Sequence, residues 1–279
     1  MPLGVLVLVL AAAGFHAAWN AMLKAAENPM ALAARAVTAG AAISTPVVAV
    51  VWLLQGRPGL PLAGWLIAVG SAALELVYFI TLSAAYRRGE LSSVYPIARG
   101  TAPLLAVAVG LVALGERVTP LALAGIACLL LGIWAVQRPS ASSAALLPAL
   151  LTGVLIAAYS SLDRVGVRLG PPWLYGWTLW VFAALFLTAF TRLTHVSEVR
   201  LTIDTRASMV VGILMTAAYF MILFALSVAP LVVVSPLRES AIVLVSVWGI
   251  WQLGERRGAW LRVGGATAIV AGIALLTIP

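Results

Sequence analysis

The sequence contains very little cysteine, histidine or charge. Among its 279 residues there is one cysteine, Cys128, and there are two histidines, His16 and His195. A disulfide within the chain and a cysteine-based metal site are therefore excluded. Charged residues make up 9% of the chain, whereas soluble domains have about 25%. The chain is thus too poor in charge for an ordinary soluble protein.

Enzyme signatures are also missing. The two histidines lie far apart, so there is no HExxH motif, and the sequence contains neither GxSxG nor a phosphate-binding P-loop. These absences exclude an ATP-driven pump made of this chain alone. We expect a protein that is not an enzyme, that has no cofactor and that binds no metal.

The net charge of +8 does not indicate nucleic acid as a partner. The arginines are spread one or two per loop, without a basic stripe or a nucleic-acid-binding motif. We interpret them as charges that flank a membrane.

Apolar sequence is abundant, at 63% of the chain. A membrane-spanning helix needs about 20 apolar residues, and runs of this length are separated by glycine, proline or charged breaks. Their lack of alternation does not fit the strands of a membrane barrel, which are about 10 residues long. The sequence therefore predicts an all-α polytopic protein in a lipid bilayer, with ten spans at Leu3–Leu23, Ala31–Leu54, Leu62–Tyr86, Leu91–Leu114, Pro120–Val136, Ala144–Leu162, Trp173–Thr191, Met209–Val228, Leu231–Leu253 and Ala259–Ile278. The first span lacks a basic segment before it, so we expect a retained helix rather than a cleaved signal peptide.

The two halves of the sequence resemble each other. The motif LGER occurs at 114–117 and again at 253–256, and Arg99 and Arg238 are separated by the same 139 residues (238 − 99 = 139). We therefore divide the chain into two repeats, 1–138 and 139–279. Each repeat holds five predicted spans, and because five is odd, the second repeat must enter the membrane from the opposite side. An inverted repeat of this kind is frequent in secondary transporters.

Two spans are interrupted in matching places. The stretch 91–105 contains Pro96 and Arg99, and the stretch 232–243 contains Pro236, Arg238 and Glu239. In inverted-repeat transporters the binding site lies near the midplane, on helices broken by proline or glycine. We expect Pro96 and Pro236 to act as hinges beside a central site.

Polar residues within spans are costly and usually face a cavity or a partner. Here they gather in six spans, three from each half, and so predict a central cavity lined by these six and enclosed by the other four. The candidate substrate-binding residues are His16, Trp19, Asn20, Glu75, Tyr78, Tyr95, Arg99, Tyr159, Tyr219, Ser235, Arg238 and Glu239.

Several of these residues also have a structural interpretation. Glu75 could pair with one of the two arginines simply to make its burial tolerable. Arg99 could bind a substrate carboxylate, or it could bond to the carbonyls that Pro96 leaves free. His16 could carry protons or be a hydrogen-bonded packing residue.

The LSSVYPIARG stretch at 91–100, the two GER motifs and the ten predicted spans resemble the EamA branch of the drug/metabolite transporter superfamily, most closely the YddG-type amino-acid exporters. The resemblance implies a ten-helix inverted repeat around a central cavity, alternating access and both termini in the cytoplasm. It also implies export of amino acids, other metabolites or cationic compounds across the bacterial inner membrane.

The loop charges oppose this orientation. With the N-terminus inside, four basic residues fall in inner loops and ten in outer loops, contrary to the positive-inside expectation. The inner ones are Arg57, Arg117, Arg164 and Arg168, and the outer ones are Lys24, Arg87, Arg88, Arg138, Arg192, Arg200, Arg206, Arg256, Arg257 and Arg262.

Three functions remain open at this point. The first is export of large or aromatic amino acids, and the second is export of cationic compounds held by Glu75 and aromatic rings. The third is a membrane protein that does not transport, against which the inverted repeat argues. A single chain supplies both halves, so a monomer could function.

Overall fold

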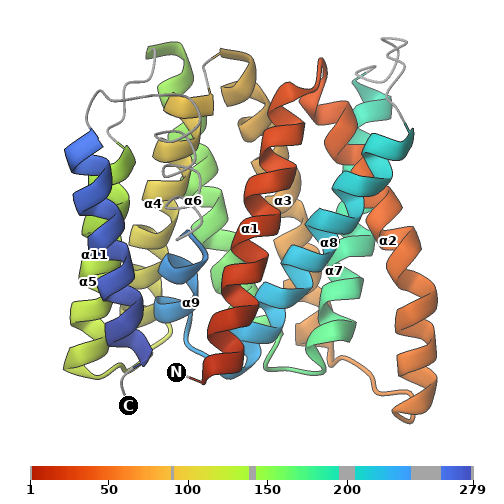
Figure 1. Cartoon of the computed structure of the whole chain (residues 1–279). Coiled ribbons are helices and arrows are strands. Elements are labelled where there is room, and N and C mark those ends of the chain that lie inside the picture. Colours follow the sequence, from red (N-terminus) through yellow and green to blue (C-terminus); the bar gives the residue numbers. More distant parts are fainter. Residues whose placement is uncertain (1, 89–90, 138–142, 195–204, 240–258, 278–279) are drawn as a thin grey trace.

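The computed structural model describes residues 2–88, 91–137, 143–194, 205–239 and 259–277, and in these residues every regular element is a helix. The helices are α1 (Leu3–Ala25), α2 (Pro29–Leu54), α3 (Leu62–Arg88), α4 (Leu91–Val112), α5 (Pro120–Gln137), α6 (Ser143–Gly166), α7 (Pro172–Leu193), α8 (Thr205–Val228), α9 (Leu231–Arg238) and α11 (Ala259–Thr277). They form one bundle in which the helices run roughly along a common direction (Figure 1). The predicted all-α polytopic membrane protein is confirmed.

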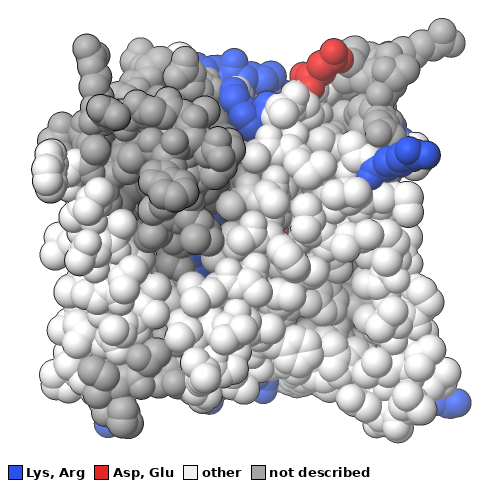
Figure 2. Space-filling view, in the orientation of Figure 1, with Lys and Arg blue, Asp and Glu red and all other residues white. Residues whose placement is uncertain are grey.

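The outside of the bundle suits a lipid environment. Among the described residues, α1, α2, α3, α6, α7 and α8 are long and apolar enough to cross a membrane. Large apolar side chains such as Leu66, Leu131 and Val270 are exposed on the outside. Figure 2 shows a broad uncharged band on one face, with most charged side chains toward its two ends.

Local sequence accounts for where the helices begin and end. Asn28 caps α2, because its side-chain oxygen accepts a hydrogen bond from the Ala31 amide at 3.0 Å, and Pro29 occupies the first helical position. After α4, Gly115 adopts a φ of +61° and turns the chain. This turn directs Glu116 back toward the end of the bundle.

The predicted helix limits are close to those observed, although α8 begins four residues before the predicted Met209 and α6 ends four residues after the predicted Leu162. Helices α1, α3 and α4 begin at the predicted residues Leu3, Leu62 and Leu91, but α6 continues to Gly166 rather than ending at Leu162. Asp163 and Arg164 therefore belong to a helix and not to a loop. Of the predicted span 231–253, residues 231–238 form α9, and residues 240–258 lie outside the described part.

Helices from the two halves pack against each other throughout. The pair α5 and α11 lies at one edge of the bundle, and α2 packs against α7 and α8 near the other edge. Between them, α3 packs on α6, α1 on α8, α4 on α9 and α4 on α6. The middle of the bundle is thus built from the six helices that carry the predicted polar residues.

Candidate functional site

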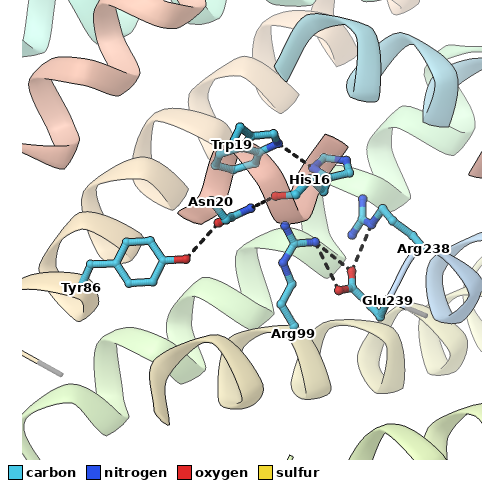
Figure 3. A network of polar contacts seen from close by, with 7 residues as sticks. All are labelled: His16, Trp19, Asn20, Tyr86, Arg99, Arg238 and Glu239. Carbon is cyan, nitrogen blue, oxygen red and sulfur yellow. Dashed lines mark hydrogen bonds and ion pairs between the residues drawn. The ribbon is translucent and has the colours of Figure 1, made fainter. Parts of the chain in front are cut away.

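An ion cluster of two arginines and one glutamate is buried in the middle of the bundle (Figure 3). Nη1 of Arg99, on α4, donates to Oε1 and Oε2 of Glu239 at 3.0 and 3.3 Å. Nε of Arg238, the last residue of α9, donates to Oε1 of Glu239 at 3.1 Å. All three residues are at most 4% exposed. Glu239 therefore joins the two interrupted segments predicted from the sequence.

In the described part of the chain, two arginines of this cluster share one glutamate. Arg99 and Arg238 each carry a positive charge, and Glu239 supplies one negative charge to both. Nη2 of Arg238 has no hydrogen-bond partner among the described residues, and a buried donor of this kind favours an anionic group beside it. A carboxylate suits this place because the fork of an arginine side chain matches its two oxygens.

Three residues of α1 form a hydrogen-bonded chain beside the cluster (Figure 3). Nε1 of Trp19 donates to Nδ1 of His16 at 3.0 Å, and Nδ2 of Asn20 donates to the His16 carbonyl at 2.8 Å. The hydroxyl of Tyr86, on α3, donates to Oδ1 of Asn20 at 2.9 Å. Because Nδ1 of His16 accepts a hydrogen bond, the imidazole proton lies on Nε2.

Asp163, near the end of α6, is the centre of a second polar cluster. Its Oδ1 accepts hydrogen bonds from the hydroxyls of Ser71 at 2.6 Å and Tyr175 at 2.8 Å. Its Oδ2 accepts one from Tyr219 at 2.6 Å. The carboxylate is 2% exposed, and Glu75 lies within electrostatic reach of both Asp163 and Tyr219. Four helices thus converge on one buried acid.

The sequence prediction did not include Asp163, because the residues from Asp163 onward read as a polar loop. A signal was present, since Asp163 follows Tyr159 by four residues and Ser160 by three, the spacing of one helical face. Extending the helix by one turn would have placed the acid on the same face as Tyr159, which was already a predicted site residue.

Aromatic rings from α3, α6, α7 and α8 form a continuous row. The centroids of Tyr78 and Tyr159 are 5.7 Å apart, and those of Tyr159 and Tyr219 are 6.4 Å apart. Trp180 stacks on Tyr219 at 4.8 Å and donates to the Thr216 hydroxyl at 2.8 Å. Trp180 is 2% exposed and therefore lies inside the bundle.

Several predicted site residues have buried polar atoms that lack a hydrogen-bond partner among the described residues. These atoms are His16 Nε2, Glu75 Oε2, Ser235 Oγ and Arg238 Nη2. Buried polar atoms in proteins are nearly always satisfied, so each exception needs an explanation. A polar small molecule bound among these side chains would supply the partners.

The remaining predicted residues are Tyr95 and the two prolines. Pro236 is buried within α9, whereas the side chains of Tyr95 and Pro96, on α4, lie outside the described part. Within the described ranges, no three histidine, cysteine, aspartate or glutamate side chains come close enough to hold a metal ion. The hinge roles of the two prolines stay predictions.

Glu116, in the turn after α4, is another residue whose role the sequence did not reveal. Its carboxylate accepts hydrogen bonds from the amides of Leu231 and Val232 at 2.9 and 3.0 Å, and from Nε of Arg164 at 2.7 Å. An acid at a helix N-terminus accepts hydrogen bonds from free amides and interacts favourably with the positive end of the helix dipole. Glu116 therefore ties α9 to the end of α6.

Comparisons with known proteins agree with this architecture. Residues 2–137 match the model of the EamA-like transporter family. No curated protein matches the chain. A solved structure described as "Crystal structure of protein" is 20% identical, with a TM-score of 0.73 over 99% of this chain and 97% of the other. At that identity the likeness concerns the fold alone.

Proposed function

Because residues 2–137 match the model of the EamA-like transporter family, we propose that the chain is a secondary transporter that exports amino acids. We further propose that its substrates are large or aromatic amino acids and related metabolites. It would move them across the bacterial inner membrane by alternating access.

The observation that carries this proposal is the buried ion cluster. Among the described residues, Arg99 and Arg238 share one glutamate, and Nη2 of Arg238 has no hydrogen-bond partner. Oγ of Ser235, one turn earlier on α9, is also without a partner. These donors suit a substrate carboxylate. The neutral His16 and Asn20 of α1 line the same region and can bind the rest of the polar end.

The aromatic row supports the preference for large apolar side chains. Tyr78, Tyr159 and Tyr219 are predicted site residues, and their rings lie next to one another. Aromatic rings stack favourably on other rings, with gains of about 0.5–1.5 kcal/mol for each pair beyond burial. An aromatic amino acid would therefore find its polar partners and its apolar surface in one place.

Reciprocal contacts support an inverted repeat with halves 1–138 and 139–279. The packing of α1 on α8 corresponds to that of α6 on α3, and the packing of α2 on α8 corresponds to that of α7 on α3.

In this proposal Pro96 and Pro236 are the hinges and a monomer is the functional unit. The two termini lie at the same end of the bundle (Figure 1), and we propose that this end is cytoplasmic.

Transport by the purified protein in liposomes tests the proposal. We would measure the uptake of labelled phenylalanine, tryptophan, leucine, glutamate and a quaternary ammonium ion against empty liposomes. We expect flux of the aromatic amino acids above the empty control. Absence of flux for every solute would contradict transport, and flux of glutamate alone would contradict the proposed preference.

A second candidate substrate class is cationic compounds. It is favoured by the buried acids Glu75 and Asp163, which lie near tyrosine rings and within reach of one another. Acids and rings together can hold an organic cation. Cation flux that survives Arg238→Met and is lost in Glu75→Gln would favour this class over amino acids.

A further inference from the structure

The polar cluster around Asp163 shares no residue with the arginine cluster, so its role needs a separate explanation. Each oxygen of the Asp163 carboxylate accepts at least one hydroxyl hydrogen bond, from Ser71, Tyr175 and Tyr219. Hydroxyl donors stabilise the charged form of an acid. In this arrangement Asp163 is therefore a hydrogen-bonded carboxylate within the bundle.

Glu75 has the opposite surroundings. It is 3% exposed, and its Oε2 has no hydrogen-bond partner in the part of the chain that the structure describes. A buried ionised oxygen that has no hydrogen-bond donor is strongly disfavoured. Asp163 is also close enough to repel a second negative charge, and two adjacent acids in a buried site tend to share one proton.

Tyr219 connects the two acids. Its single hydroxyl proton is donated to Asp163, and its side chain also interacts with Glu75. Because a phenol oxygen can accept as well as donate, a protonated Glu75 can donate to Tyr219 while Tyr219 donates to Asp163. The three residues then form one connected hydrogen-bond chain.

We propose that Glu75, Tyr219 and Asp163 form a proton-binding site, which takes up one proton from solvent as an O–H bond on the Glu75 carboxyl group. Release breaks this bond and returns the proton to solvent, so no other reactant is needed. The claim that this proton drives transport rests on the proposed function. The claim that the site binds a proton does not.

Other charged and titratable groups act on this site and would respond to its protonation. Arg238 of α9 interacts electrostatically with both acids and with Tyr159, and Arg99 of α4 acts on the two neighbouring tyrosines. The groups that face the two acids are Tyr78 of α3, Tyr159 of α6, Tyr175 of α7, Tyr219 of α8 and Arg238 of α9. Loss of the Glu75 charge on protonation would weaken its attraction to Arg238, which links the site to the arginine cluster.

Infrared difference spectroscopy of the purified full chain tests proton binding without any substrate. The difference between spectra recorded at a pH where the site is protonated and at a pH where it is deprotonated should show a protonated carboxyl band. This band should disappear in Glu75→Gln and shift in Tyr219→Phe. The matched control Ser160→Ala, which removes a buried hydroxyl on α6, should keep the band. A wild-type band that both acid variants, Glu75→Gln and Asp163→Asn, leave unchanged would overturn the proposal, as would the absence of a band.

Coupling is tested separately in liposomes. The readout is the flux of labelled phenylalanine with a pH gradient divided by its flux without one. We expect a ratio of at least several-fold in wild type and Ser160→Ala, a ratio near one in Glu75→Gln and Asp163→Asn, and partial recovery in Asp163→Glu. A wild-type ratio of one with measurable flux would overturn coupling and leave transport intact. Absence of all flux would contradict the proposed function, while the infrared bands still decide proton binding.

Discussion

The two halves of the molecule share the contacts that hold helix ends in place. In the first half, Nζ of Lys24, on α1, donates to the Tyr86 carbonyl of α3 at 2.6 Å. In the second half, Nη1 of Arg164, on α6, donates to the Leu226 carbonyl of α8. Both the donors and the acceptors are separated by 140 residues (164 − 24 = 140; 226 − 86 = 140). These equivalent contacts belong to the common framework.

The polar centre is where the halves differ. The residue before Arg164 is Asp163, whereas the residue before Lys24 is Leu23, which is fully buried in the apolar core. Likewise, the residue after Arg238 is Glu239, whereas Gly100 follows Arg99. Both acids that organise the described polar clusters thus occur in the second half alone. The repeated contacts therefore hold the helices in place, and the positions at which the two halves differ in sequence make the polar centre asymmetric.

The largest effect is expected from Glu239→Gln, which removes the negative charge between Arg99 and Arg238. Leaving buried charges without their partner costs about 3–5 kcal/mol. We expect a strong loss of thermal stability, measured as the melting temperature of the purified protein in detergent. Glu27→Gln, at an exposed position, is the matched control and should melt like wild type. Equal melting of both variants would show that the cluster does not stabilise the fold.

The shared framework contacts are expected to have intermediate effects. Lys24→Met and Arg164→Met each remove a charged donor to a helix-end carbonyl, and such bonds contribute about 1.5–3 kcal/mol. Both variants should lose stability in the same melting assay, and Arg164→Met should lose more because Arg164 also forms an ion pair with Glu116. A large loss in one variant with none in the other would break the equivalence of the halves.

The helix pair α5 and α11 offers a smaller test of the same symmetry. A Cβ added to Gly132 would lie 2.6 Å from the carbonyl oxygen of Gly265. A Cβ added to Gly272 would lie 2.6 Å from the carbonyl oxygen of Gly125. We expect Gly132→Ala and Gly272→Ala each to cost about 1–3 kcal/mol through overpacking. Gly264→Ala is the control, because nothing lies within 4 Å of its added carbon. Destabilisation by the control alone would contradict the observed packing.

The smallest effect is expected from Ser71→Ala, which removes one of the three hydroxyl donors to Asp163. A typical hydrogen bond contributes about 1 kcal/mol, and Tyr175 and Tyr219 still serve the carboxylate. We expect a slight fall in melting temperature, compared with Ser160→Ala, whose hydroxyl has no hydrogen-bond partner. A larger fall for Ser160→Ala would contradict the assigned donors.

Most of the fold could be predicted from the sequence, because long apolar runs and their breaks mark spans independently of tertiary structure. Arg99, Arg238 and Glu239 were found for the same reason, since charges inside an apolar run are conspicuous. Which arginine meets which acid was left open, because distances between helices are not encoded in local pattern. The structure places Glu239, rather than Glu75, between both arginines.

Asp163 and Glu116 show where sequence reasoning reached its limit. Both lie at the edge of an apolar run, where a charged residue is expected in a loop. Their roles depend on partners distant in sequence, namely Ser71 and Tyr219 for Asp163, and the first amides of α9 for Glu116. Only the tertiary structure brings these groups together.

Counterflow of labelled phenylalanine in liposomes is the most direct test of the central claim that the asymmetric polar centre binds substrate. We predict flux above empty liposomes for wild type and for Arg35→Met, an exposed arginine on α2. For Arg238→Met, whose melting must be checked in parallel, we predict a fall of at least about tenfold, which corresponds to about 1.4 kcal/mol. Undiminished flux in folded Arg238→Met would contradict the account.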